Sequence, residues 1–169
     1  MNNLLIEAID SVIEESQNPI ILEHSSNTAK IKTYLRDKYV PLAIDLSEAR
    51  PCDLFITEFY DHKNYPRWYV NMCTLCIQNS NEKNILIIDS LEEVDANITS
   101  QLLTEIVMDE QNNYPLPENA TIIIASNGKI SKEQKQLLEE YNDYLTFVNS
   151  DDSEDIYITF GADKKGKTK

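Results

Sequence analysis

A chain of 169 residues with a net charge of −14 is a poor candidate for binding nucleic acid or an anionic membrane, because both need clustered lysine and arginine. Its 41% hydrophobic and 26% charged residues are typical of a globular domain, and its apolar runs are far shorter than the ~20 residues that span a membrane. The three cysteines are a sparse, odd set and no basic and apolar leader opens the chain, so we expect a cytoplasmic protein.

The first half of the chain alternates between helical and strand-like spacing of its apolar residues. Thr28 is a candidate N-cap where a short apolar run gives way to a helical pattern. The expected elements are a helix over 2–16, a strand over 18–23, a helix over 28–38, strands over 40–46 and 53–59, a loop over 60–67 and a helix over 68–77.

The second half contains the clearest strand, residues 84–90, whose continuous apolar run is typical of a central parallel strand covered on both faces. Asn97 and Ser131 are candidate N-caps for the helices that follow. The remaining expected elements are a helix over 97–110, a strand over 120–126, a helix over 131–143 and strands over 144–150 and 155–160.

This alternation of strands and helices predicts an α/β fold, a three-layer sandwich around a mostly parallel sheet. We expect a single domain over 1–160, followed by a flexible basic tail over 161–169. Ligands of such sheets bind at the carboxyl ends of the strands. The loop over 24–31, Asp89 and Asn127 are all predicted to lie there.

Four stretches of roughly residues 18–148 resemble, in the right order, the nucleotide-binding core of AAA+ ATPases, and in particular the MoxR-like branch. They are NPIILEHSSNTAKI at the first strand and phosphate loop, VPLAIDLSEARPCDL at the second strand, ILIIDSLEEVDANITSQLLTEIVMDEQ at the Walker B strand and YPLPENATIIIASNGK at the sensor-1 strand. The resemblance implies a P-loop NTPase fold, with ATP and Mg²⁺ as the ligands of an active member.

The resemblance assigns a nucleotide-site role to three residues. Lys30 matches the phosphate-binding lysine, Asp89 the aspartate that supports Mg²⁺, and Asn127 the polar residue that positions water near the terminal phosphate. Each also has an ordinary interpretation. Lys30 suits an exposed helix, Asp89 a turn after a strand, and Asn127 a turn with Gly128. Both interpretations stay open.

Five parts of the family's machinery are missing or replaced in this sequence. The phosphate loop has His24 and Ala29 at its glycine positions, and the whole chain holds only three glycines. Ile31 replaces the hydroxyl that binds Mg²⁺, and Ser90 replaces the glutamate that activates water. Residues 139–150 contain no arginine to act as a finger, and the sequence ends about where the family's lid domain would begin.

These losses predict a degenerate AAA+ domain that hydrolyses ATP poorly or not at all and serves as a binding or scaffolding subunit, with a protein partner or another copy. The alternative is a weak ATPase in which Lys30, Asp89 and Asn127 hold nucleotide and magnesium, with water positioned by Glu92 or Glu93. A minor alternative is an acidic inhibitor that imitates nucleic acid. No cofactor is expected except ATP and magnesium under the weak-ATPase alternative.

Cys73 and Cys76 have the spacing of a metal or redox pair. They lie in an apolar stretch that predicts a helix, where residues three apart share one face, so we expect small core residues. A zinc site would need a second pair, and neither Cys52 nor the two histidines supply one in a recognisable pattern. No metal site is expected.

Overall fold

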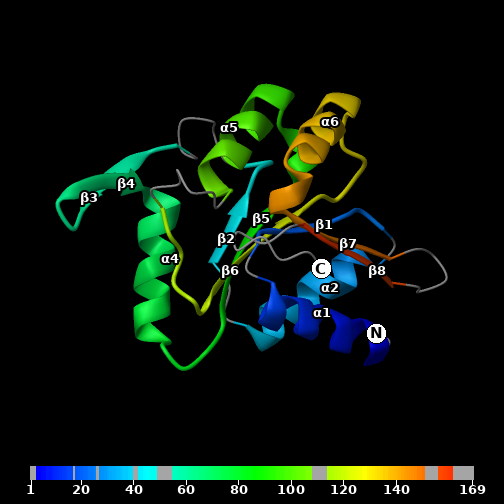
Figure 1. Cartoon of the computed structure of the whole chain (residues 1–169), viewed down its shortest axis with the longest axis horizontal. Coiled ribbons are helices and arrows are strands. Elements are labelled where there is room, and N and C mark those ends of the chain that lie inside the picture. Colours follow the sequence, from blue (N-terminus) through cyan, green and yellow to red (C-terminus); the bar gives the residue numbers. More distant parts are fainter. Residues whose placement is uncertain are drawn as a thin grey trace.

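A six-stranded sheet with helices on both faces forms the centre of the computed structural model (Figure 1). The structure describes residues 3–16, 18–25, 27–39, 42–48, 55–107, 114–150 and 156–161. The strands are, in sheet order, β2 (Leu42–Asp45), β5 (Asn84–Asp89), β6 (Ala120–Ala125), β1 (Ile20–Leu22), β7 (Thr146–Ser150) and β8 (Ile156–Phe160). All neighbours pair in parallel except β7 and β8, so the expected α/β sandwich with a mostly parallel sheet is confirmed.

The middle of the sheet is built from apolar runs that are buried on both faces. Every residue of β5 is buried, and β6 is buried after its first residue. The two strands pair in register, with Leu86 opposite Ile122 and Ile88 opposite Ile124. Because successive side chains of a strand point to opposite faces, each run supplies apolar residues to both helix layers.

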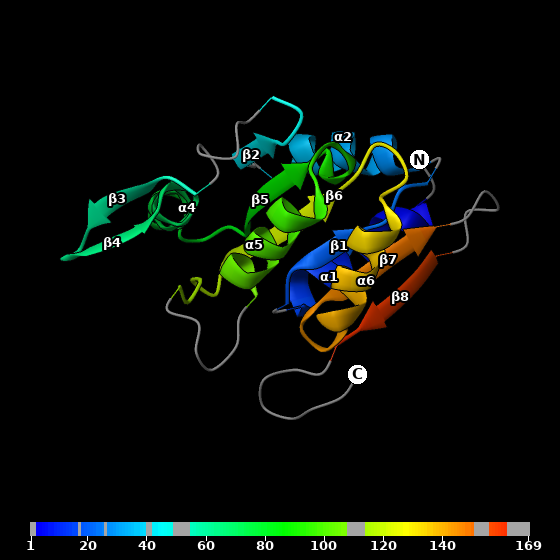
Figure 2. The same ribbon diagram turned by 90° about the horizontal axis from the view of Figure 1, so that it is seen from above.

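Helices α1 (Asn3–Glu15) and α2 (Thr28–Lys38) cover one face of the sheet, where Ile13 and Ile31 pack against Ile87 in one core cluster. The other face carries α4 (Arg67–Gln78), α5 (Ala96–Ile106) and α6 (Lys132–Glu140) (Figure 2). Short 3₁₀ turns follow β5 (Leu91–Glu93) and α6 (Asn142–Tyr144). The predicted helix over 131–143 therefore ends three residues early, while its start was predicted correctly.

Two of the three predicted N-caps are wrong by one or two residues. Asn27 occupies the N-cap position of α2, and Thr28 is the first helical residue. Asp95 caps α5 by accepting a hydrogen bond of 2.8 Å from the backbone N–H of Ile98, so Asn97 lies inside the helix. Ser131 caps α6 as predicted and forms a capping box.

The predicted loop over 60–67 is a β-hairpin in large part. Strands β3 (Thr57–Tyr60) and β4 (Lys63–Pro66) pair antiparallel in a separate two-stranded sheet beside α4 (Figures 1 and 2). Asp61 and His62, with φ of 49° and 69°, form the turn between them. Two-residue hairpin turns with positive φ usually contain glycine or asparagine, and less often aspartate, which stands here at position 61. The turn signal in the sequence was therefore weak, and it supported a loop without indicating the two paired strands.

Several predictions fall on residues outside the described ranges. They concern Cys52, the first two residues of the predicted strand over 53–59, the end of the helix over 97–110 and residues 162–169 of the tail. In the described part of the predicted 53–59 strand, β3 begins only at Thr57. On α4, Cys76 is buried and Cys73 is half-buried, which agrees with core positions. None of the helices in the described ranges is long and apolar enough to cross a membrane.

Candidate functional site

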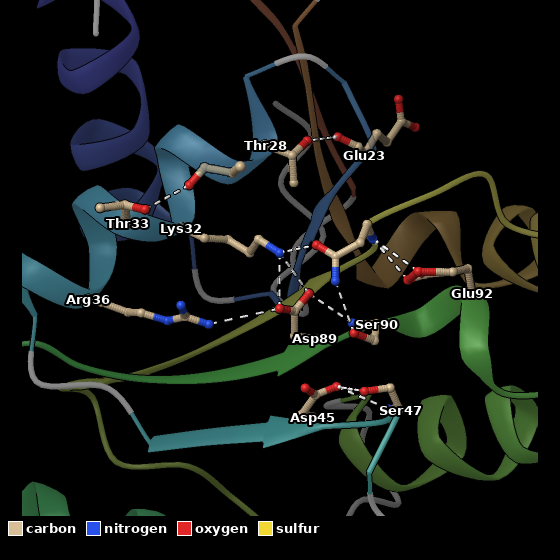
Figure 3. A network of polar contacts seen from close by, with 12 residues as sticks. Glu23, Thr28, Lys32, Thr33, Arg36, Asp45, Ser47, Asp89, Ser90 and Glu92 are labelled. Atoms are coloured by element: carbon tan, nitrogen blue, oxygen red, sulfur yellow. Dashed lines mark hydrogen bonds and ion pairs between the residues drawn. The ribbon is translucent and has the colours of Figure 1, made fainter.

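The carboxyl ends of β5 and β6 meet one face of α2 at the edge of the sheet. Asp89 is the last residue of β5, and Asn127 follows β6 by two residues. Ile88 pairs with Ile124, so these two neighbouring strands end side by side. Lys32 lies in the second turn of α2 and points toward both ends (Figure 3).

Lys32 makes the central contacts of this site. Its ammonium group donates hydrogen bonds to both carboxylate oxygens of Asp89, at 3.1 and 3.0 Å, and to the side-chain oxygen of Asn127. These contacts match the three donors of an ammonium group. The side chains of Lys32 and Asp89 are only 9% and 11% exposed, so this is a buried ion pair whose charges are fully hydrogen-bonded.

Three further groups hold the partners of Lys32 in place. The Asn127 side-chain nitrogen donates to the Ser90 hydroxyl at 3.0 Å, and the Asn127 backbone N–H donates to the Glu92 carboxylate at 2.9 Å. Arg36, 53% exposed, places its guanidinium 3.9 Å from the Asp89 carboxylate. Together they fix the orientation of both side chains that contact Lys32.

Ser90 adopts a strained backbone conformation, with φ of 68°. A residue other than glycine in this left-handed region costs of the order of 1 kcal/mol, and such residues often cluster at functional sites. The turn lets the Ser90 backbone N–H donate to the Asp89 carboxylate at 2.8 Å while its hydroxyl accepts from Asn127.

A second carboxylate lies beside this network. Asp45 ends β2 and pairs in register with Asp89. Hydrogen bonds from the hydroxyl and the backbone N–H of Ser47 hold the pKa of Asp45 below its usual value, and Lys32 adds a smaller lowering effect. Of the two strand-end carboxylates Asp45 and Asp89, only Asp89 is buried.

Of the residues singled out from the sequence, Asp89 and Asn127 are brought together and Lys30 is not. Lys30 is exposed on α2. Residues two apart on an α-helix point roughly 200° from each other, so Lys30 faces away from the direction that Lys32 takes. The lysine that contacts Asp89 and Asn127 is therefore Lys32.

Sequence reasoning missed Lys32 because it followed the spacing of the phosphate-loop motif. The helical period held the signal that could have found it. Thr28, Ile31, Lys32 and Leu35 have the i, i+3, i+4, i+7 spacing of a buried stripe, and all four are buried. A lysine at such a position needs an acidic partner.

The loop between β1 and α2 hydrogen-bonds to itself. The backbone N–H of Ser25 donates to the Thr28 hydroxyl at 2.8 Å, and that of Thr28 donates to the Ser25 carbonyl at 3.2 Å. The N–H of Asn27 donates to the Ser25 hydroxyl at 3.3 Å, and the Thr28 hydroxyl donates to the Glu23 carbonyl at 3.0 Å. Phosphate loops instead present successive free N–H groups to oxygen atoms of the ligand.

The donor set does not fit the Mg²⁺ ion that the AAA+ resemblance implies. Mg²⁺ needs oxygen ligands in near-octahedral geometry. Both oxygens of Asp89 accept hydrogen bonds from Lys32, and Ile31, at the position of the metal-binding hydroxyl, is packed in the core. Glu92 is held by the Asn127 backbone, and Glu93 is exposed. The positive charge at this site is supplied by Lys32.

No protein-family model matches the chain, and no curated protein matches it either. Among solved structures it is similar to a chain of Drosophila ORC bound to AT-rich DNA and Cdc6, at 12% identity and a TM-score of 0.42, covering 83% of this chain and 51% of that one. It is also similar to unliganded Pif1 from Bacteroides sp., at 14% identity and a TM-score of 0.43, covering 85% of this chain and 36% of that one.

A third similar structure is the protein PH0250 from Pyrococcus horikoshii OT3, at 14% identity and a TM-score of 0.42, covering 96% of this chain and 83% of that one. The chain thus spans about half the length of the ORC chain and about a third of Pif1. None of these similarities bears on the activity of the chain.

Proposed function

We propose that the chain is a degenerate P-loop domain of the AAA+ type, related to the MoxR-like branch, that acts as a binding or scaffolding subunit and hydrolyses ATP poorly or not at all. One observation carries this proposal. The ammonium group of Lys32 lies between Asp89 and Asn127, the two residues assigned to magnesium and to the attacking water.

Nucleotide binding at this site would have to displace contacts that already satisfy the protein. Mg²⁺ would need the Asp89 carboxylate, and freeing it would leave the buried charge of Lys32 without its partner. Losing one partner of a buried pair costs about 3–5 kcal/mol, which is a large part of the binding free energy of a micromolar ligand, about 8 kcal/mol. The self-bonded loop between β1 and α2 adds a further cost, since its N–H groups would have to be released.

The binding part of the proposal rests on apolar side chains that the fold leaves exposed. Phe59 on the β3–β4 hairpin is 72% exposed, and Ile77 on α4 is 69% exposed. The hairpin lies beside the N-terminal end of α4, and Ile77 is near the C-terminal end of that helix (Figure 1). These exposed positions on the hairpin and α4 define the surface proposed for binding. A protein partner or another copy of the chain is the class of occupant proposed for this surface.

Isothermal titration with ATP, ADP and a non-hydrolysable analogue, each with and without Mg²⁺, tests the nucleotide part of this function. The expected result is no heat and no thermal shift up to millimolar nucleotide. Micromolar binding that is lost in Lys30→Ala would overturn the proposal and favour the weak ATPase that uses Lys30, Asp89 and Asn127. Lys132→Met, an exposed lysine at the start of α6, is the matched control.

A further inference from the structure

A cavity of about 480 Å³ lies at the carboxyl ends of β1, β6 and β7, where these strands meet α6. This volume is within the range of small-molecule sites, roughly 300–1,000 Å³. The residues that line the cavity do not include Lys32, Asp89 or Asn127, although His24 of the predicted phosphate loop and Ser126 and Gly128, which flank Asn127, are among them. The cavity is therefore adjacent to the Lys32 network and not part of it.

The interior of the cavity is apolar. It is lined by the buried side chains of Ile21, Ile124, Leu91 and Leu138 and by the half-buried ring of Phe147. These residues come from strand ends, the turn after β5 and helix α6, so their positions are fixed by the core itself. Such walls favour an aliphatic or aromatic group of the ligand.

Charged groups of both signs surround this apolar interior. Glu23 is half-buried, while Lys129, Lys135 and Glu139 are exposed. Burial raises the pKa of Glu23, and the charge of Lys135 partly offsets that effect. Figure 3 shows the Glu23 carboxylate pointing away from Lys32 and Asp89, so it is not part of their network.

We propose that this cavity binds a free α-amino acid with an apolar side chain. Its side chain would pack on the apolar walls, its ammonium group would pair with Glu23, and its carboxylate would pair with Lys135. The carboxylate of Glu23 would repel a purely anionic ligand, and the ammonium groups of Lys129 and Lys135 would repel a purely cationic one. A ligand with both charges next to an apolar group satisfies all three features.

The neutral polar groups of the cavity agree with this assignment. Ser126 and Asn149 also line it, at the ends of β6 and β7. A hydroxyl and an amide can donate to a carboxylate and accept from an ammonium group, so they suit a zwitterion. This inference does not depend on the proposed scaffolding function.

Titration of the full chain with L-phenylalanine and L-leucine, followed by calorimetry and by ligand-observed NMR, tests the proposal. We expect saturable binding with a Kd of roughly 0.1–1 mM, as ligands of this size allow. Phenethylamine lacks the carboxylate and 3-phenylpropionate lacks the ammonium group. Each should bind at least tenfold more weakly than L-phenylalanine.

Substituting the charged residues of the cavity and measuring the Kd tests whether the amino acid binds there. Glu23→Gln should raise the Kd for L-phenylalanine at least tenfold and leave 3-phenylpropionate no weaker, and Lys135→Met should weaken both. Glu133→Gln and Lys132→Met, exposed on α6 and outside the lining, are matched controls that should leave the Kd unchanged. Circular dichroism verifies folding, and Lys135→Met decides the question if Glu23→Gln does not fold.

Three results would overturn the proposal. They are no saturable binding of either amino acid at 10 mM, equal binding of a single-charge analogue, and equal loss of affinity in a control variant.

Discussion

Replacing Lys32 by methionine tests whether the buried ion pair contributes to stability as its geometry indicates. Methionine keeps most of the aliphatic stem, so the packing of α2 changes little and the main loss is the ammonium group. Asp89 then keeps the Ser90 backbone N–H at 2.8 Å and loses both hydrogen bonds from Lys32. A carboxylate that is 11% exposed would be left without its principal counter-charge.

The expected loss follows from the burial of the pair. Removing one partner of a fully buried pair costs about 3–5 kcal/mol. Arg36, at 3.9 Å from Asp89 and 53% exposed, can move closer and recover part of this energy, so we expect a loss of about 2–3 kcal/mol. With an m-value of about 2 kcal/mol/M, the midpoint of urea unfolding should fall by about 1–1.5 M.

Equilibrium unfolding in urea at pH 7, followed by circular dichroism, measures this loss. Lys30→Met is the matched control on the same helix, and because Lys30 is exposed its cost should stay within about 0.5 kcal/mol. The double variant Lys32→Met, Asp89→Asn should recover part of the loss, because it removes the uncompensated charge. Equal costs for Lys32→Met and Lys30→Met would refute the buried ion pair.

Three further predictions concern other buried or half-buried polar groups. Gln134→Ala should cost about 2–3 kcal/mol in urea unfolding, because its buried amide on α6 donates to the carbonyls of Leu91 and Val94 in and after the 3₁₀ turn and to the Thr99 hydroxyl on α5. A cost under about 0.5 kcal/mol would contradict this. Partial burial alone would raise the pKa of Asp10, but hydrogen bonds from Lys38 and two tyrosines lower it, so Asp10→Asn should be less stable at pH 7 and the difference should shrink as the pH falls below about 4. Burial raises the pKa of Glu105, which accepts from Trp68, so Glu105→Gln should melt slightly higher at pH 7 and lose that advantage as the pH falls through the raised pKa, with none left below about pH 4. Thermal melts across pH 3–8 measure both, and parallel curves for variant and parent would contradict either.

The central strands were predictable because their local pattern and their place in the fold agree. Continuous apolar runs such as 84–89 suit only strands that are covered on both faces, and the structure places them there. The meeting of Asp89 and Asn127 was predictable for a related reason, since parallel strands that are neighbours end at the same edge.

The hairpin and the role of Lys32 depend on contacts between residues that are distant in the sequence, which the local spacing of apolar and polar residues does not reveal. The turn at Asp61 and His62 uses positive φ, which is uncommon for any residue other than glycine, and Tyr114, distant in the sequence, packs against Tyr65 of the hairpin. Lys32 gains its role only from strands that follow it by more than fifty residues. The spacing of the phosphate-loop motif indicated Lys30 instead, because that spacing carries no information on which face of the helix is buried.

The β3–β4 hairpin can unfold locally while the six-stranded sheet and its helices stay folded. A two-stranded sheet by itself is marginally stable in water, so the hairpin depends on its attachment to the body. That attachment includes Tyr65, whose ring centroid lies 5.2 Å from that of Tyr69 and 6.1 Å from that of Tyr114. Amide protons of the hairpin should therefore exchange with solvent through local unfolding, while those of β5 and β6 exchange only when the whole domain unfolds.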